Sequence, residues 1–187
     1  MALIQVNYLS KALMRTVPLN VILPVDKISF ETMDYAAEKG QKYKTLYLLH
    51  GIFGNYTDWV SGTRIQRWAE QKNLAVVMPS GDNAFYVKTE LPTFDYETFV
   101  GQELVEVTRR MFPLSDKRED TFIAGLSMGG YGAMHNGMKF NETFGYIASL
   151  SGALNILDSK QSLLGINALF GDYEEAVKSD KNIRVGI

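Results

Sequence analysis

One short stretch, residues 125–129, constrains the fold of this chain most, because its sequence GLSMG places a serine between two glycines. An apolar segment precedes it at 121–124, and a segment of helical character follows at 130–135. Strand, sharp turn and helix in this order are typical of a nucleophile elbow, where strained backbone and close packing leave no room for side chains beside the serine. We therefore predict that Ser127 is a catalytic nucleophile. The alternative is a surface serine in a glycine-rich turn.

The rest of the chain predicts strands that alternate with helices. Two antiparallel strands are expected near the N-terminus, at 4–8 and 15–23, from their apolar alternation and β-branched residues. Nearly continuous apolar runs predict buried strands at 45–49 and 74–79. Two further strands are expected, one at 120–124 directly before the serine motif and one at 145–151. Apolar residues at helical spacing predict helices at 62–72, 96–112, 161–170 and 173–179, and polar residues predict a loop at 34–44. The pattern indicates an α/β fold, a mainly parallel sheet with helices on both faces.

The carboxyl ends of the predicted strands carry the residues of chemical interest. The pairs His50-Gly51, Ser80-Gly81 and Ser151-Gly152 follow three of these strands, as the glycine-flanked Ser127 follows a fourth. In open parallel sheets the ligand crevice lies at this edge. We therefore expect four loops to converge on one site around Ser127.

Composition narrows the class of protein. The chain has 187 residues, no cysteine and a net charge of -2, so we expect one domain over 1–187 without disulfides, thiolate metal sites or a cysteine nucleophile. No basic stripe suggests a nucleic-acid partner, and no apolar run is long enough for a membrane span. The N-terminus lacks the pattern of a signal peptide, which favours a cytoplasmic protein. His50 and His135 have no ligand spacing with carboxylates, so no metal is expected.

The turn at 50–54 is the second feature of the predicted site. Its glycines allow a backbone N–H to face a substrate carbonyl, and the N–H of Met128, directly after the serine, is the usual second donor of such an oxyanion hole. His50 precedes the serine, and we interpret it as a structural histidine that bonds a neighbouring loop. The alternative role for His50 is that of a general base.

Three ordered motifs resemble a known family. The stretches 47–55 (YLLHGIFGN), 76–81 (VVMPSG) and 124–133 (AGLSMGGYGA) are similar to the esterase D group of α/β-hydrolases, and the similarity extends over nearly the whole chain. This group includes bacterial tributyrin esterases, which the chain resembles most, S-formylglutathione hydrolases and mycolyltransferases. The resemblance implies an α/β-hydrolase fold and a serine carboxylesterase that acts on small short-chain acyl esters without a cofactor. It also implies that Ser127 is the nucleophile and that Ile52 and Met128 supply the oxyanion N–H groups.

The chain departs from that family in its catalytic triad, which in this fold follows the order serine, acid, histidine. The only histidine after Ser127 is His135, eight residues further along the helix and about 12 Å away by helical rise, so it cannot take the serine proton. We expect that the last βα units, about 60–80 residues, are missing and that this chain alone is inactive or nearly so. We also expect an exposed edge strand near Ile147, which would favour a homo-oligomer or a bound C-terminal fragment. Carboxylates follow the serine at Asp158, Asp172, Glu174, Glu175 and Asp180.

Several other side chains have a predicted role. Phe85 and Tyr86 would wall the substrate site or pack in their loop, and Trp59 would pack in the core or line the crevice. Glu97 and Glu103 are expected on a solvated helix face, and Tyr131 is expected to be buried. Three other functions remain open at this point: an S-formylglutathione hydrolase, an acyltransferase, and a non-catalytic remnant that only binds.

Overall fold

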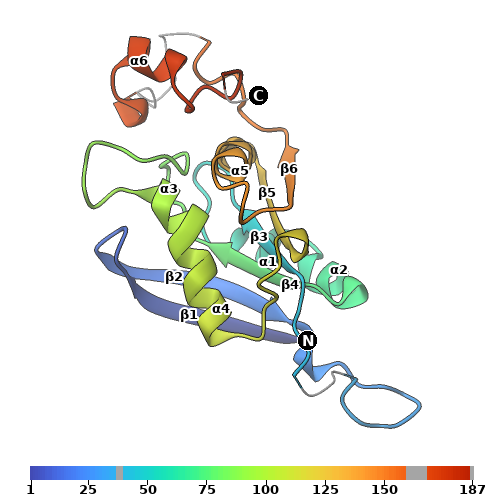
Figure 1. Cartoon of the computed structure of the whole chain (residues 1–187). Coiled ribbons are helices and arrows are strands. Elements are labelled where there is room, and N and C mark those ends of the chain that lie inside the picture. The colour runs from blue at the N-terminus through green and yellow to red at the C-terminus, as the bar shows by residue number, and fades with distance from the viewer. Residues whose placement is uncertain (37–39, 159–167, 186–187) are drawn as a thin grey trace.

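The computed structural model describes residues 1–36, 40–158 and 168–185 and contains a six-stranded sheet in the order β1-β2-β4-β3-β5-β6 (Figure 1). An antiparallel hairpin of β1 (Ala2–Ser10) and β2 (Arg15–Leu23) forms one side of this sheet. The strands β4 (Ala75–Pro79), β3 (Thr45–Leu49), β5 (Thr121–Leu126) and β6 (Tyr146–Leu150) run parallel to one another, and β2 pairs antiparallel with β4. The predicted mainly parallel sheet is confirmed.

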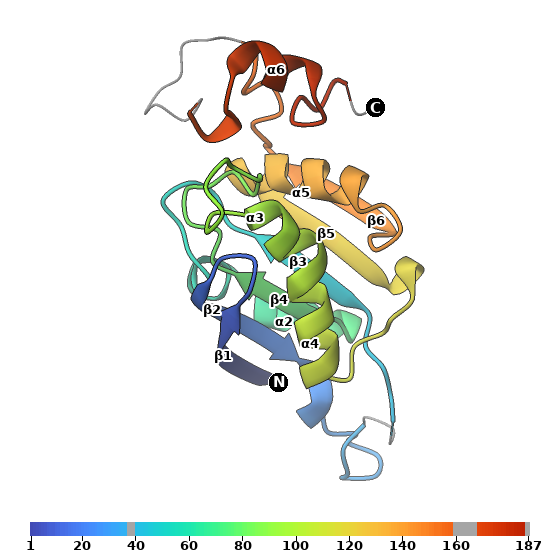
Figure 2. The same cartoon turned by 60° about the vertical axis from the view of Figure 1, so that its left-hand side comes forward.

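Helices cover both faces of the sheet (Figure 2). The stretch from α3 (Tyr96–Thr98) through a π-helical turn (Phe99–Glu103) to α4 (Leu104–Met111) is one continuous helical segment. It lies with α5 (Met128–Lys139) on one face, while α2 (Ile65–Lys72) lies on the other. The short helix α1 (Asp58–Gly62) follows β3, and α6 (Tyr173–Lys178) lies near the C-terminus. The sequence prediction of a helix at 161–170 falls mostly outside the described residues.

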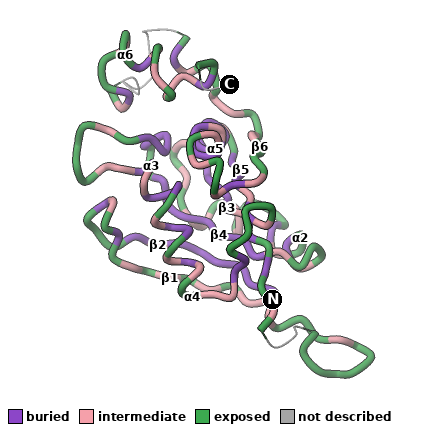
Figure 3. The backbone as a smooth tube through the Cα atoms, viewed as in Figure 1, coloured by how far each residue is buried: buried purple, intermediate pink, exposed green. Residues whose placement is uncertain are grey.

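Alternation along the strands divides the core into two parts, since neighbouring residues of a strand face opposite sides. In β3, Tyr47 and Leu49 pack towards α4 and α5, and Leu48 packs with Ile65 and Ala69 of α2. The buried residues are concentrated in the central strands, and the chain around α6 is mostly exposed (Figure 3). The prediction that β3 and β4 are buried on both faces is therefore confirmed.

Strand β6 forms an open edge of the sheet. Among the described strands it pairs only with β5, and Tyr146, Ile147 and Leu150 are 63%, 36% and 47% exposed. The expectation of an exposed edge near Ile147 is confirmed.

The predicted solvated position of Glu103 is wrong. Its carboxylate accepts hydrogen bonds from the Ser10 hydroxyl and from the amides of Lys11 and Ala12, at 3.2, 3.0 and 2.7 Å. These donors lie at the end of β1 and in the turn that follows it, so Glu103 links the hairpin to the helical segment. The local helix pattern could not predict these contacts of Glu103, because the partners lie more than 90 residues away in the chain.

Candidate active site

Ser127 occupies a sharp bend between β5 and α5. Its φ of 56° and ψ of -114° lie in a region that non-glycine residues rarely adopt, which marks a strained backbone. A Cβ at Gly125 would lie 2.2 Å from the Gly129 oxygen, and a Cβ at Gly129 would lie 2.4 Å from the Leu49 oxygen. Glycine is therefore required on both sides of the serine, as the sequence predicted.

The main chain of Ser127 is tied to the segment around β6. Its N–H donates to the Leu150 oxygen at 2.9 Å, and its carbonyl accepts from the Ala153 amide at 3.2 Å and from the Tyr131 amide at 3.0 Å. The side chain is half-buried, and its hydroxyl has no hydrogen-bond partner among the residues that the structure describes. The bend thus holds the hydroxyl in place while leaving it available to react.

The turn Gly51–Gly54 passes beside the serine. A Cβ at Gly51 would lie 3.7 Å from the Ser127 Cβ. The turn is closed by a 3.2 Å bond from the Gly54 amide to the Gly51 oxygen, and Phe53 adopts a φ of 67° with its amide bonded to Asn83. Within the described ranges, the amides of Ile52 and Met128 have no acceptor. Two unused N–H groups therefore belong to segments that adjoin the nucleophile, which is the arrangement an oxyanion hole needs.

His50 is a structural residue. It is 1% exposed, its Nδ1 lies 2.7 Å from the Gly51 oxygen, and its Nε2 accepts a 2.8 Å hydrogen bond from the Gly81 amide. An accepting Nε2 assigns the proton to Nδ1, and burial lowers the pKa of His50, so both features favour the neutral ring. The prediction that His50 bonds a neighbouring loop is confirmed. Neither ring nitrogen is free to take a proton from Ser127.

The two aromatic residues predicted to wall the substrate site lie in the interior. Tyr86 is fully buried, and its hydroxyl donates to the His50 oxygen at 3.0 Å. Phe85 is 3% exposed and makes edge-to-face contacts with Tyr131 and Phe170. Both residues have positive φ values, so this loop turns their rings inward. Both side chains therefore pack inside the chain, which is the alternative that the sequence left open for them, and the prediction that Tyr131 is buried is confirmed.

A cavity of about 220 Å³ lies beside the elbow. Trp59 forms part of its wall and also packs partly against the core on the α2 side, so both interpretations of this residue apply. Sequence reasoning missed Asp58 and Leu126, although Leu126 stands inside the motif and Asp58 directly precedes the tryptophan. Two larger cavities near residues 88–91 and 168–172 do not include Ser127 or its neighbours. The cavity is lined by His50, Gly51, Asp58, Trp59, Gly62, Thr63 and Leu126.

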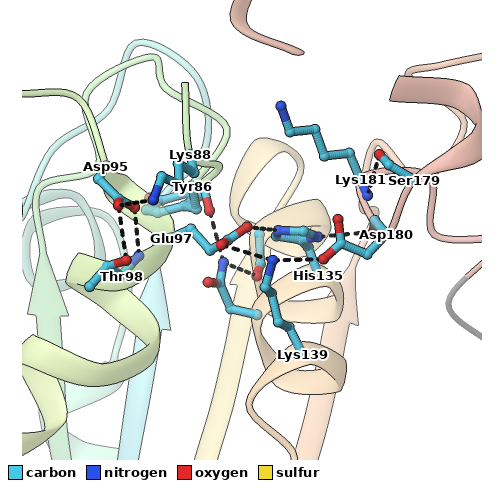
Figure 4. Close-up of polar contacts among 12 residues, drawn as sticks. Tyr86, Lys88, Asp95, Glu97, Thr98, His135, Lys139, Ser179, Asp180 and Lys181 are labelled. Carbon is cyan, nitrogen blue, oxygen red and sulfur yellow. Dashed lines mark hydrogen bonds and ion pairs between the residues drawn. The ribbon is translucent and has the colours of Figure 1, made fainter. Parts of the chain in front are cut away.

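A second polar cluster joins α3, α5 and the C-terminal segment (Figure 4). His135 is 1% exposed, with Nε2 2.7 Å from Glu97 Oε2 and Nδ1 3.1 Å from the Asp180 oxygen. Lys139 Nζ contacts Glu97 Oε1 at 2.9 Å and Asp180 Oδ2 at 2.7 Å. The predicted solvated position of Glu97 is therefore wrong, because the side chain is 7% exposed. Burial alone would raise the pKa of Glu97, but hydrogen bonds from His135 and Lys139 outweigh it and lower that pKa to about 2.

His135 is thus engaged in this cluster and, as predicted, is not placed to serve Ser127. Within the described ranges, no group of three or more histidine, aspartate or glutamate residues is arranged to hold a metal ion. None of the helices described combines the length and the apolar character needed to cross a bilayer.

Comparison with known proteins identifies the family to which this chain belongs. The family model described as "Putative esterase" matches residues 10–183, and the chain belongs to this esterase family. It is 43% identical to an acetyl esterase of Caldicellulosiruptor saccharolyticus, over 98% of this chain and 72% of that protein. A substrate-bound fluorophosphonate-binding serine hydrolase of Staphylococcus aureus is similar in structure, with a TM-score of 0.82 and 30% identity over 99% of this chain and 71% of that one.

An S-formylglutathione hydrolase of the same organism is also similar, with a TM-score of 0.80 and 30% identity over 99% of this chain and 72% of that chain. Together with the sheet order and the helices on both faces, these likenesses confirm the α/β-hydrolase fold.

Proposed function

We propose that this chain carries the nucleophile of a serine carboxylesterase that cleaves short-chain acyl esters. One observation carries the proposal: Ser127 stands at a strained bend, and among the residues that the structure describes its hydroxyl has no partner and two amides in the adjoining segments have no acceptor. Membership of the esterase family supports ester cleavage. The identity to an acetyl esterase favours a short acyl group.

The chemistry follows from this geometry. Ser127 Oγ attacks the ester carbonyl carbon, and the carbonyl oxygen gains the negative charge. The amides of Ile52 and Met128 then stabilise that oxygen, and one such donor is worth roughly 3 kcal/mol. The positive end of α5 adds a favourable field at the same point. The tetrahedral intermediate expels the alcohol, and water later releases the acid from the acyl-enzyme.

The proton transfers need a base that the described residues do not offer. His50 and His135 are both hydrogen-bonded elsewhere. We therefore place the triad histidine and its acid outside the 187 residues, in a segment that would pair with the open edge of β6. Residues 1–187 alone would then keep only the residual rate that binding and the oxyanion hole supply.

The test is the variant Ser127→Ala in the protein expressed from its complete reading frame. Hydrolysis of p-nitrophenyl acetate and butyrate should fall to the background rate, and a fluorophosphonate probe should label the wild type only. Undiminished turnover by the variant would contradict the role of Ser127. Failure of the wild type to react with the probe would instead favour a non-catalytic remnant.

A second candidate is an S-formylglutathione hydrolase, favoured by the structural similarity to that enzyme of Staphylococcus aureus. The same serine would attack a thioester instead of an oxygen ester. Comparing kcat/KM for S-formylglutathione and for p-nitrophenyl acetate distinguishes the two activities. Acyl transfer to an alcohol is a third candidate activity. Analysis of the products formed with added alcohol acceptors detects it.

A further inference from the structure

The cavity of about 220 Å³ beside the elbow lies on the β3 side of Ser127. Gly51 and Leu126 both line it, and the peptide oxygen of Leu126 lies 3.5 Å from where a Gly51 Cβ would stand. Leu126 directly precedes Ser127 and is 43% exposed. A group attached to the carbonyl carbon under attack can therefore reach this cavity.

The side on which the cavity lies decides which part of the ester enters it. In the tetrahedral intermediate, the leaving oxygen must face the histidine that protonates it, and the acyl chain points elsewhere. A segment that supplies this histidine would add beyond β6, because the other edge of the sheet is the antiparallel strand β1. The cavity is lined by the turn after β3, by α1 and by the end of β5, on the opposite side of Ser127 from β6. It is therefore the place for the acyl group.

The lining gives this pocket two distinct properties. The indole of Trp59 and the side chain of Leu126 make apolar walls that limit the length of the acyl chain. Asp58 contributes an exposed carboxylate, which has no ion pair or hydrogen bond to its side chain among the described residues. A negative charge that no cation balances repels a second negative charge nearby.

We infer that Trp59 limits acyl length in this pocket and that Asp58 rejects acyl groups ending in a carboxylate, so that short uncharged acyl groups are selected over dicarboxylic ones. This inference rests on the proposed esterase function of Ser127.

The charge test uses the protein expressed from its complete reading frame. It compares two substrates with the same four-carbon acyl chain, p-nitrophenyl butyrate and the mono-p-nitrophenyl ester of succinate. After subtraction of spontaneous hydrolysis, the wild-type ratio of kcat/KM for butyrate over succinate should exceed that of Asp58→Asn by about fivefold at low salt. The difference should shrink as salt is added, because Asp58 is exposed. The matched control is Asp116→Asn, an exposed carboxylate in the loop before β5, which should leave the ratio unchanged.

The length test compares p-nitrophenyl octanoate with acetate. Trp59→Ala should raise the octanoate-to-acetate ratio of kcat/KM by about tenfold, since removing the indole lengthens the pocket. Trp59→Phe should restore most of the wild-type preference and guards against misfolding of the alanine variant. Trp68→Ala, which removes the chain's other tryptophan from an exposed position on α2, should change nothing.

The outcomes separate the two proposals. Hydrolysis by the wild type with ratios that these variants leave unchanged overturns the pocket assignment and leaves Ser127 as the nucleophile. A wild type that hydrolyses none of the four esters overturns the proposed function, and the inference with it.

Discussion

Replacing Glu97 by glutamine gives a quantitative test of the cluster that joins α5 to the C-terminal segment. The pKa of Glu97 is about 2 in the folded chain, against an ordinary value of 4.5. Each unit of difference corresponds to ~1.4 kcal/mol, so the charged form of Glu97 stabilises the fold by about 3 kcal/mol. The carboxylate is only 7% exposed, so solvent screening reduces this value little.

The sign of the effect fixes its pH dependence. Because the folded pKa lies below the ordinary value, the stabilisation is fully present above pH 4.5 and is lost as the pH falls towards 2. Glu97→Gln should therefore lower the free energy of unfolding by about 3 kcal/mol at pH 7, and the gap from the wild type should close as the pH falls.

Urea denaturation of the 187-residue chain, followed by circular dichroism at pH 7, 5, 4 and 3, measures this gap. The control is Glu106→Gln, which breaks an exposed 3.9 Å pair with Arg110 and should not measurably change stability at any of these pH values. A gap between wild type and Glu97→Gln that stays constant from pH 7 to pH 3 would refute the reasoning, because a purely steric defect does not titrate.

Two further predictions concern the packing around the nucleophile. Gly129→Ala should abolish both ester hydrolysis and fluorophosphonate labelling and lower the melting temperature, because its Cβ would lie 2.4 Å from the Leu49 oxygen; retained labelling would show that the bend tolerates a side chain. Tyr86→Phe should lower the free energy of unfolding by about 1 kcal/mol, because it removes the buried hydrogen bond to the His50 oxygen; a neutral result in urea denaturation would mean that this bond contributes nothing net.

The parts of the site that the sequence predicted correctly depend on local constraints. The bend at Ser127 needs glycine at positions 125 and 129, and a strand before it and a helix after it are visible within 15 residues. The parallel sheet was predicted from strands that alternate with helices along the chain, and the apolar runs of β3 and β4 marked its buried centre. Such features can be recognised in a sequence because the residues that impose a local structure lie next to the residue that adopts it.

The errors have the opposite origin. Glu97 meets His135 and Lys139 on α5, 38 or more residues away, and no helical pattern records these partners. For Phe85 and Tyr86 the sequence left packing in the loop and lining the site both open, because their residue types do not suggest the positive φ values of that loop. Asp58 and Leu126 gain their significance only from a cavity that the turn after β3, α1 and the end of β5 enclose together. The bend at Ser127 was thus predictable from the sequence, and the contacts that surround it were not.

The hydrogen bonds that Ser127 makes with Leu150 and Ala153 couple its backbone to the end of β6 and to the segment that follows. A strand or partner that pairs with the open edge of β6 would therefore also restrict the backbone that positions the Ser127 hydroxyl. Such a partner should also slow hydrogen exchange at the Ser127 amide, which donates to the Leu150 oxygen.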